Sequence, residues 1–85
     1  MKKLWTDQGW EDYVYWQTQD RKTLKRLNKL INDVERNGEN SGIGNPEPLR
    51  NNLSGWWSRR IDEENRIVYR IRNGNLEIAQ CKGHY

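Results

Sequence analysis

Apolar residues recur with two different periods along the chain, and the change of period separates a helical part from a strand-rich part. Spacing of three and four residues is clearest between residues 20 and 37, in a stripe formed by Leu24, Leu27, Leu30, Ile31 and Val34. The opposite face is basic and carries Lys22, Lys25, Arg26, Lys29 and Arg36. Asp20 and the pair Asn37-Gly38 are typical start and stop residues of a helix. The pattern predicts an amphipathic helix with a solvated, basic outer face.

Another helix is predicted upstream, with Thr6 or Asp7 as its cap and its end near Gln19. Helical spacing connects four of its residues, Trp10, Tyr13, Val14 and Gln17. We expect Trp10 and Val14 to face the core. The residues before it, 2–6, predict a short strand.

Residues 37–48 are rich in Gly, Asn and Pro and predict a long loop. From residue 49 onward polar and apolar residues alternate, which is typical of strands. Four strands are expected, at Leu49–Leu53, Trp56–Asp62, Arg66–Arg72 and Leu76–Lys82. Asn73-Gly74 predicts a two-residue hairpin turn between the last two.

The order of one strand, two helices and four strands predicts an α+β fold in which the helices pack on a small antiparallel sheet. A chain of 85 residues suffices for one such domain, residues 1–85. Within Arg66–Arg72, alternation assigns Ile67, Tyr69 and Ile71 to the core and the arginines to the opposite face. The five tryptophans are expected mainly in the core rather than stacked on bases, because other large apolar residues are few.

The charge and the cysteine content of the chain restrict which partners and which cellular compartment are expected. The chain has 15 Lys and Arg against 12 Asp and Glu, and the basic residues of its second half are almost all arginine. Arginine can grip a phosphate with two hydrogen bonds, although a merely soluble basic surface explains the charge equally well. The single cysteine, Cys81, excludes an internal disulfide and indicates a reducing, cytoplasmic compartment. No apolar run follows Lys2-Lys3, so neither a signal peptide nor a membrane span is expected.

Most catalytic motifs are absent from the sequence. One cysteine and one histidine are too few for a zinc site. The acidic group Asp62-Glu63-Glu64 lies at a predicted hairpin turn, where a solvated turn is favoured over a magnesium site. The glycines of residues 38–44 lack the strand and helix that flank a phosphate-binding loop. A Ser/His/Asp arrangement stays open, but no serine lies in a nucleophile-elbow sequence.

RNA cleavage needs no metal, because the 2′-hydroxyl can attack the adjacent phosphate. The protein must then supply a base, an acid for the leaving 5′-oxygen, and cations for the crowded phosphate. His84, the only histidine, ionises near neutral pH and is the expected acid. Glu47, confined between Pro46 and Pro48, is the favoured base, and the arginines within residues 66–72 are candidate cations. An incidental glutamate in a rigid turn and an ordinary polar face of arginines are the alternatives that spacing leaves open.

The whole chain resembles the YoeB toxins (Txe/YoeB family, RelE superfamily) of bacterial toxin–antitoxin modules. The motifs that carry the resemblance are WEDYVYW (residues 10–16), LKRLNKLI (24–31), GIGNPEPL (42–49), NLSGWWSRRI (52–61), EENRIVY (63–69) and CKGHY (81–85). Toxins of this family are mRNA interferases, endoribonucleases that cut messenger RNA in the ribosomal A site and so inhibit translation. The resemblance implies a RelE-like fold and no metal or other cofactor.

The resemblance also implies roles for individual residues. Glu47 would be the general base and His84 the general acid, while Arg66 would stabilise charge on the scissile phosphate. Tyr85 would orient the substrate or the acid. Three further residues would bind the substrate phosphates: Arg50, Arg59 and Arg60.

This sequence departs from the family pattern at two positions. Arginine occupies position 50, where lysine is common, which keeps the charge but removes a proton donor. Gly83 replaces a bulkier residue and is expected to loosen the tail that carries His84, with some loss of precision but not of activity.

The resemblance implies a YefM-like antitoxin that blocks the site, with the pair repressing its own operon. It further implies the bacterial ribosome and mRNA as partners, allows a homodimer, and implies no membrane. A non-catalytic RNA- or ribosome-binding module is the main alternative, and a purely structural antitoxin-binding partner is a third. They differ from the enzyme in whether Glu47 and His84 do chemistry.

Overall fold

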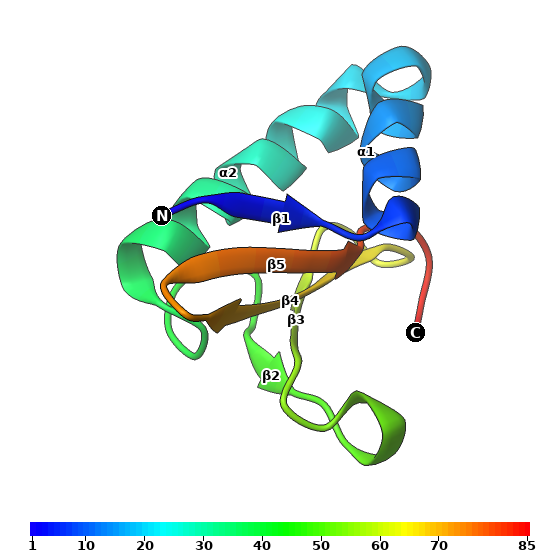
Figure 1. Ribbon diagram of the computed structural model, residues 1–85. Coiled ribbons are helices and arrows are strands. Elements are labelled where there is room, and N and C mark those ends of the chain that lie inside the picture. The colour runs from blue at the N-terminus through cyan, green and yellow to red at the C-terminus, as the bar shows by residue number, and fades with distance from the viewer.

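Two helices cover one face of a five-stranded sheet, and no helix covers the other face (Figure 1). The computed structural model describes residues 1–85. In chain order the elements are β1 (Lys3–Trp5), α1 (Asp7–Gln19), α2 (Arg21–Asn37), β2 (Glu47–Pro48), the 3-10 helix η1 (Asn51–Leu53), β3 (Trp57–Arg60), β4 (Arg66–Arg72) and β5 (Asn75–Gln80). The strands lie in the order β1-β5-β4-β3-β2. The predicted α+β class and the order of elements are confirmed.

Both helices begin at predicted cap residues. Thr6 Oγ1 accepts a hydrogen bond from Gly9 N at 2.9 Å at the start of α1. Asp20 accepts one from Thr23 N at 3.1 Å at the start of α2. At the other end of α2, Gly38 adopts a φ of 89°, which glycine tolerates at little steric cost. The two helices are therefore bounded by local hydrogen bonding that the sequence encodes.

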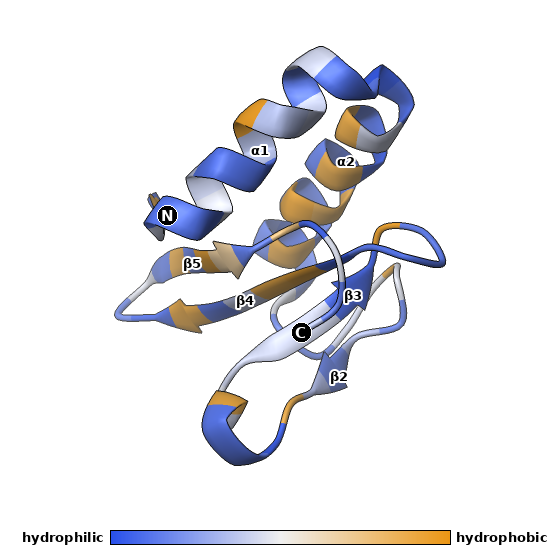
Figure 2. Cartoon of the chain, turned by 90° about the vertical axis from the view of Figure 1, so that its right-hand side faces the viewer, coloured by the Kyte–Doolittle hydropathy of each residue, from blue (hydrophilic) through white to orange (hydrophobic).

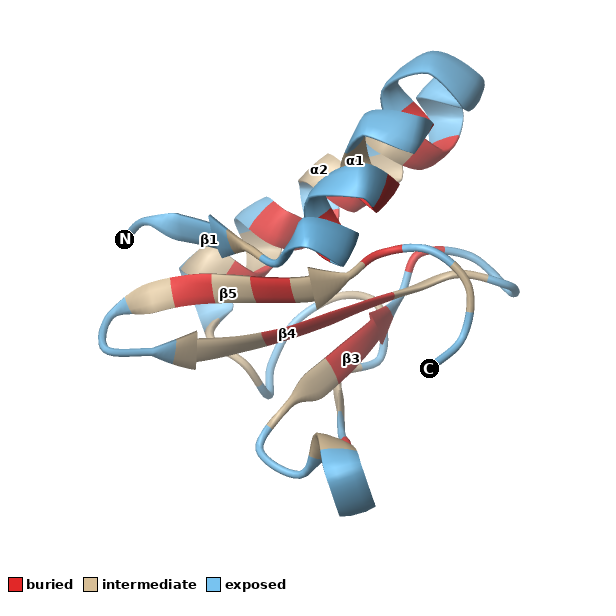
Figure 3. Ribbon diagram, turned by 45° about the vertical axis from the view of Figure 1, so that its right-hand side comes forward, coloured by how far each residue is buried: buried red, intermediate tan, exposed pale blue.

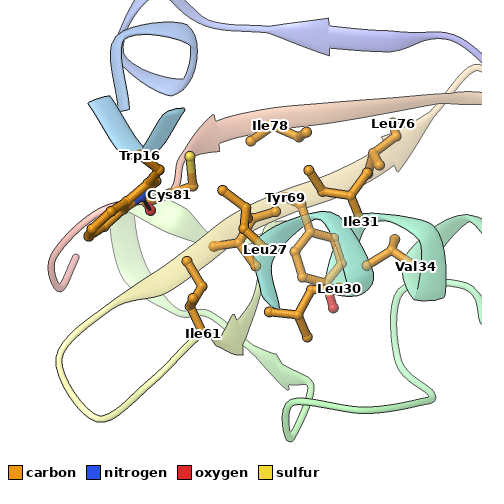
Figure 4. Close-up of a cluster of buried hydrophobic side chains, with 11 residues drawn as sticks. Trp16, Leu27, Leu30, Ile31, Val34, Ile61, Tyr69, Leu76, Ile78 and Cys81 are labelled. Atoms are coloured by element: carbon orange, nitrogen blue, oxygen red, sulfur yellow. Dashed lines mark hydrogen bonds between the residues drawn. The ribbon is translucent and has the colours of Figure 1, made fainter. Parts of the chain in front are cut away.

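The core lies between α2 and the helix-facing side of the sheet (Figure 4). Apolar residues of α2 line the side of the helix that faces the strands (Figure 2). The buried cluster consists of Trp16, Leu27, Leu30, Ile31, Val34, Ile61, Ile67, Tyr69, Leu76, Ile78 and Cys81. Trp16 is the one tryptophan within it, while Trp5 and Trp57 pack against its edge. The expectation that tryptophans fill the core therefore holds only in part.

α1 turns a different face to the core from the one that its spacing predicts. Gly9, Asp12 and Trp16 are buried, whereas Trp10 is 51% exposed and Val14 is 40% exposed. Figure 3 shows α1 as a largely exposed helix with few buried positions. A Cβ atom on Gly9 would lie 2.6 Å from a carbonyl oxygen of β5, so glycine is what lets this face of α1 rest on the strand. The prediction that Trp10 and Val14 face inward is wrong.

The sheet is mixed, not wholly antiparallel. β2 to β5 pair antiparallel as predicted, but β1 pairs parallel with β5, with Lys3 opposite Leu76 and Trp5 opposite Ile78. Hairpin turns fix the relative direction of strands that follow one another in sequence. β1 has no such neighbour, which is why the sequence pattern did not give its direction.

The predicted strand Leu49–Leu53 is wrong. β2 has two residues, one more bond joins Leu49 N to Trp56 O at 2.9 Å, and the chain then turns at Asn51, whose φ is 59°. Leu53 N then donates a hydrogen bond to Arg50 O at 3.1 Å. This local turn uses a backbone N–H and a carbonyl that a strand would pair with a neighbouring strand. β3 and β5 also end two residues before their predicted limits. Neither helix has the length and apolarity needed to cross a bilayer.

Candidate active site on the open face of the sheet

Strand register places several candidate residues on the face of the sheet that the helices leave open. Glu47 of β2 pairs with Ser58 of β3, and Arg60 of β3 pairs with Arg66 of β4. Residues directly opposite each other, and residues two apart on one strand, project from the same face. Glu47, Ser58, Arg60 and Arg66 therefore share one face. The opposite face carries the core residue Ile67.

The C-terminal tail, residues 81–85, starts in the core at Cys81 and reaches this open face with its last residues (Figure 2). Arg66 N donates a hydrogen bond to Gly83 O at 3.1 Å, and the hydroxyls of Tyr85 and Ser58 are 3.3 Å apart. The Arg66 guanidinium carbon lies 6.0 Å from the centre of the Tyr85 ring. Because Ser58 is the cross-strand partner of Glu47, the tail ends beside the strand pair that carries the predicted base. His84 is exposed between these contacts.

The loop before β2 is held in a defined conformation next to Glu47. Gly44 O accepts from Arg60 N at 2.7 Å, and Gly44 has a φ of 83°. A Cβ atom on Gly44 would lie 2.6 Å from a methyl carbon of Leu30, so glycine is required at this close approach. The carboxylate of Glu47 accepts one hydrogen bond, from Asn45 Nδ2 at 3.0 Å.

The arginines of the open face carry charge that no acidic side chain neutralises. Arg50, Arg60 and Arg66 form no salt bridge, since the three in the molecule join other residues. Arg66 Nη1 is buried and has no hydrogen-bond partner. A buried, unpaired guanidinium donor is unusual, because such a group costs free energy until it is bonded. An anion placed here would satisfy it.

A shallow hollow of about 440 Å³ adjoins the tail. It is lined by residues 48–53 and by Tyr85, which combine apolar side chains, two asparagine amides and the Arg50 guanidinium. The hollow places Arg50 on the same side of the molecule as the tail.

Arg59 does not belong to this face, and its predicted role in substrate binding is contradicted. It is fully buried on the helix-facing side of β3, opposite Ile67. Its Nε donates to the Tyr69 hydroxyl, and its other four donors bond Asp33 Oδ2 and the carbonyls of Gly38, Ser41 and Ile43. All five donors of an arginine are thereby used within the protein. Arg59 fastens the loop before β2 to the sheet.

Burial and hydrogen bonding shift the pKa of groups around the site. The hydrogen bond from Arg59 lowers the pKa of Asp33, with help from the bond that Ile43 N donates. Burial raises the pKa of the Tyr69 hydroxyl. Burial raises the pKa of the Cys81 thiol to about 12, so this cysteine is a neutral core residue and not a nucleophile near neutral pH.

The acidic turn after β3 is structural. Asp62 Oδ1 accepts from the backbone amides of Glu64 and Asn65 at 2.9 and 2.7 Å, which closes the turn. The three acidic residues are exposed, and no three His, Cys, Asp or Glu side chains are grouped as a metal site requires. Asn65, which sequence reasoning did not select, also bonds the tail at Gly83 N.

Comparison with known proteins identifies the family. Residues 5–85 match the family model described as YoeB-like toxin of bacterial type II toxin-antitoxin system. The chain belongs to the YoeB toxin family. It is 49% identical to Toxin YoeB of Escherichia coli strain K12 over 85 residues, which cover all of both chains. It is a toxin of a type II toxin–antitoxin system.

Solved structures of family members share the fold. A YoeB/ParE toxin from Agrobacterium tumefaciens superimposes with a TM-score of 0.95 at 42% identity, over all of both chains. The YoeB-YefM complex from Staphylococcus aureus gives 0.94 at 42% identity, and the YoeB dimer from the same organism gives 0.93 at 44% identity. Each of these two comparisons covers all of this chain and 98% of the other.

Sequence reasoning missed two residues that touch the tail, Ser58 and Asn65. Both lie within motifs shared with the family, but neither is a residue type that suggests proton transfer. Ser58 could have been found from strand register, because it faces Glu47 across the β2–β3 pair. Asn65 had no such signal, since its contact to Gly83 joins parts of the chain 18 residues apart.

Proposed function

We propose that this toxin is an endoribonuclease that depends on the ribosome and cuts messenger RNA in the A site, thereby inhibiting translation. The grouping of Glu47, Arg66 and the tail on the open face carries the proposal, because it brings a carboxylate and a cation next to the segment that ends in His84. Family membership supports the same reading, since the resemblance predicts an RNA-cleaving toxin.

The proposed reaction is general acid–base catalysis without a metal. Glu47 takes the proton from the ribose 2′-hydroxyl, and the 2′-oxygen forms a bond to the adjacent phosphorus. The bond from phosphorus to the 5′-oxygen then breaks, and His84 donates its proton to that oxygen. The products are a 2′,3′-cyclic phosphate and a 5′-hydroxyl. The acid and the base would each contribute roughly 10²–10⁴-fold to the rate.

The arginines and the terminal tyrosine bind and orient the substrate for this reaction. Arg66 binds the phosphate as negative charge grows on its oxygens, an effect that is strong where water is excluded. Arg50 and Arg60 bind neighbouring phosphates, because neither is paired with a carboxylate. Tyr85, with its hydroxyl against Ser58, orients the ribose or the His84 ring.

The partners follow from the same surface. We propose a YefM-like antitoxin whose acidic, partly disordered segment lies across the basic open face. The complex of the Staphylococcus aureus relative with YefM supports this assignment, and its dimer supports self-association of this chain. The ribosome and mRNA are the targets, and the cytoplasm is the compartment.

Replacing Glu47 with glutamine separates an enzyme from a binding module. The amide keeps the size of the side chain but cannot accept the proton, so cleavage should fall by roughly 10²–10⁴-fold. Binding of the variant to ribosomes, measured by co-sedimentation, should persist. Cleavage is measured by primer extension on a message held in translating ribosomes.

The matched control is Glu64→Gln, which removes the same charge from the exposed turn after β3. It should cleave at the wild-type rate. If the wild-type protein binds ribosomes at stoichiometric amounts and leaves the message intact, the non-catalytic module is the correct reading. If Glu47→Gln cuts as fast as wild type, the assignment of the base is wrong.

A further inference from the structure

We propose that Asn65 is a positioning residue: with Asp62 it forms a clip that fixes Gly83 and thereby places His84 at the reacting bond. The inference rests on the proposed function in one respect, the role of His84 as the acid. The clip itself consists of hydrogen bonds at the point where the tail crosses the start of β4.

The tail is held firmly before His84 and only lightly after it. Cys81 is anchored to α1, because its N–H donates to Asp12 Oδ2 at 3.0 Å and its carbonyl accepts from Trp16 Nε1 at 2.8 Å. Gly83 is anchored through both of its backbone polar groups: its N–H donates to Asn65 Oδ1 at 2.8 Å, and its carbonyl accepts from Arg66 N at 3.1 Å. Beyond Gly83 the tail makes one hydrogen bond, between the hydroxyls of Tyr85 and Ser58 at 3.3 Å. Gly83 is therefore the last fixed point before the acid.

Gly83 is also the residue at which the tail is freest to bend. Its φ of 74° lies in the left-handed region, and no atom lies near the place of a Cβ. Glycine loses more conformational entropy on ordering than any other residue. Without an anchor on its N–H, the direction of the chain into His84 would be poorly fixed. The Asn65 side chain supplies that anchor.

The orientation of the Asn65 amide is determined by its partners. Its Nδ2 faces both carboxylate oxygens of Asp62 at 3.1 Å, and a carboxylate only accepts hydrogen bonds. Its Oδ1 is therefore the atom left to accept from Gly83 N. Asp62 is fixed in turn by the amides of Glu64 and Asn65. The acidic turn thus holds one amide group in place, and that group holds the tail.

The clip is tested first in the free protein, without ribosomes. In Asn65→Ala, hydrogen exchange of the Gly83 amide should accelerate about tenfold or more, because a protected amide becomes open to water. The imidazole signals of His84, the one histidine of the chain, should show increased mobility by NMR relaxation. Asn65→Gln, with the same amide one methylene out of place, should act in the same direction and serves if the alanine variant folds poorly.

The matched control is Asn75→Ala. Asn75 Oδ1 accepts a hydrogen bond from a backbone amide, Lys2 N at 3.3 Å, on the β1–β5 side of the sheet. This variant should change neither Gly83 exchange nor His84 mobility. If Asn65→Ala and Asn65→Gln also leave both unchanged, the clip does not exist and the proposal falls. That result is independent of whether the protein cuts RNA.

A double-mutant cycle with His84→Gln tests the catalytic part. Misplacement of a reacting group by about 1 Å can cost roughly 10²-fold, so Asn65→Ala should slow cleavage by roughly 10- to 100-fold in the wild-type background. In the His84→Gln background it should slow the residual rate less than about twofold, because the group it positions is gone. Equal losses in both backgrounds would mean that Asn65 acts through Arg66 or general folding, and would overturn its role toward His84. If the wild-type protein does not cut at all, the proposed function fails, and the exchange experiment still decides the clip.

Discussion

Arginines within a short stretch of this chain have three different environments, and each environment decides what the residue does. Arg59 is buried with all five donors bonded within the protein. Arg70 stacks on Trp56 at 4.0 Å and pairs with Glu77 at 2.6 Å. Arg66 keeps one buried donor without a partner. Of these three residues, only Arg66 has a buried donor that is not bonded within the protein.

The link between Arg59 and Asp33 predicts a pH dependence of stability. The pKa of Asp33 is lower in the folded state than in the unfolded state. Its ionised form therefore stabilises the fold at pH values above the unfolded-state pKa of about 3.9. This contribution is lost as the pH falls through the lower pKa of the folded state. The free energy of unfolding of Asp33→Asn should fall below that of wild type by the largest amount near neutral pH. The gap should narrow as pH falls below about 4.

Urea unfolding at a series of pH values measures this gap. Asp20, whose pKa is also lowered, through its bonds to Thr23, is present in both proteins and cancels in the difference. A gap that stays constant from neutral to acid pH would show that the charge of Asp33 is not what stabilises the loop.

Alternation in the sequence correctly placed Arg66 on the open face of the sheet, but Arg59 was wrongly expected to reach the substrate from that face. The alternation that separates core from open face in Arg66–Arg72 applies equally to β3. Arg59 pairs with Ile67 and so belongs to the core face. A charged residue on a core face is rare unless it is paired, and its partners Asp33 and the loop carbonyls come from distant parts of the chain. The alternation of polar and apolar residues within one strand cannot predict such distant partners.

The two helices differ in how far their sequences determine their orientation. α2 has one dominant apolar stripe, and the predicted face is the buried one. α1 offers two competing stripes at helical spacing, and the buried one contains Gly9 and Asp12. Asp12 is buried because it bonds the backbone of Cys81, a partner that exists only after the chain has folded. The long loop and the Asn73-Gly74 turn were predictable, whereas the parallel pairing of β1 was not.

The core role of α2 predicts unequal effects of two truncations on the same helix. Leu27 is fully buried in the cluster, and Lys29 is exposed. Leu27→Ala should lower the free energy of unfolding by about 2–5 kcal/mol, because it leaves a cavity. Lys29→Ala should change it by less than about 0.5 kcal/mol. Thermal or urea unfolding measures both, and similar losses for the two variants would contradict the placement of α2.

The molecule as a whole presents two unlike surfaces. The open face of the sheet is polar and basic and carries the tail. The outer side of α1 and β1 is aromatic: the rings of Trp5, Trp10 and Tyr13 lie 4.7 to 6.1 Å apart, and Val14 continues the patch. A group of exposed apolar side chains of this kind marks an interaction surface. We propose that this surface is where a second copy of the chain binds, since the Staphylococcus aureus relative forms a dimer.

Substitution of Trp10 tests that assignment. Trp10→Ser removes the most exposed ring of the patch and should weaken dimerisation by more than about tenfold, as loss of an aromatic anchor does. The control is Tyr15→Ser, which removes an exposed ring that packs on Lys82 instead. Sedimentation over a range of concentrations measures the dimer. If wild type and Trp10→Ser dimerise equally, the aromatic patch is not the dimer interface.

The pairing of β1 with β5 has a consequence for how the toxin becomes competent. The Thr6 hydroxyl and the Ala79 carbonyl that it bonds are 73 residues apart in sequence, so this edge closes a loop spanning nearly the whole domain. Contacts of such long range form late, because the entropy of loop closure must be overcome first. β5 leads directly into Cys81 and the tail. We therefore expect a freshly synthesised or refolding chain to assemble its helices early and to acquire harmful activity only at the final kinetic step, which gives a cognate inhibitor time to intercept it.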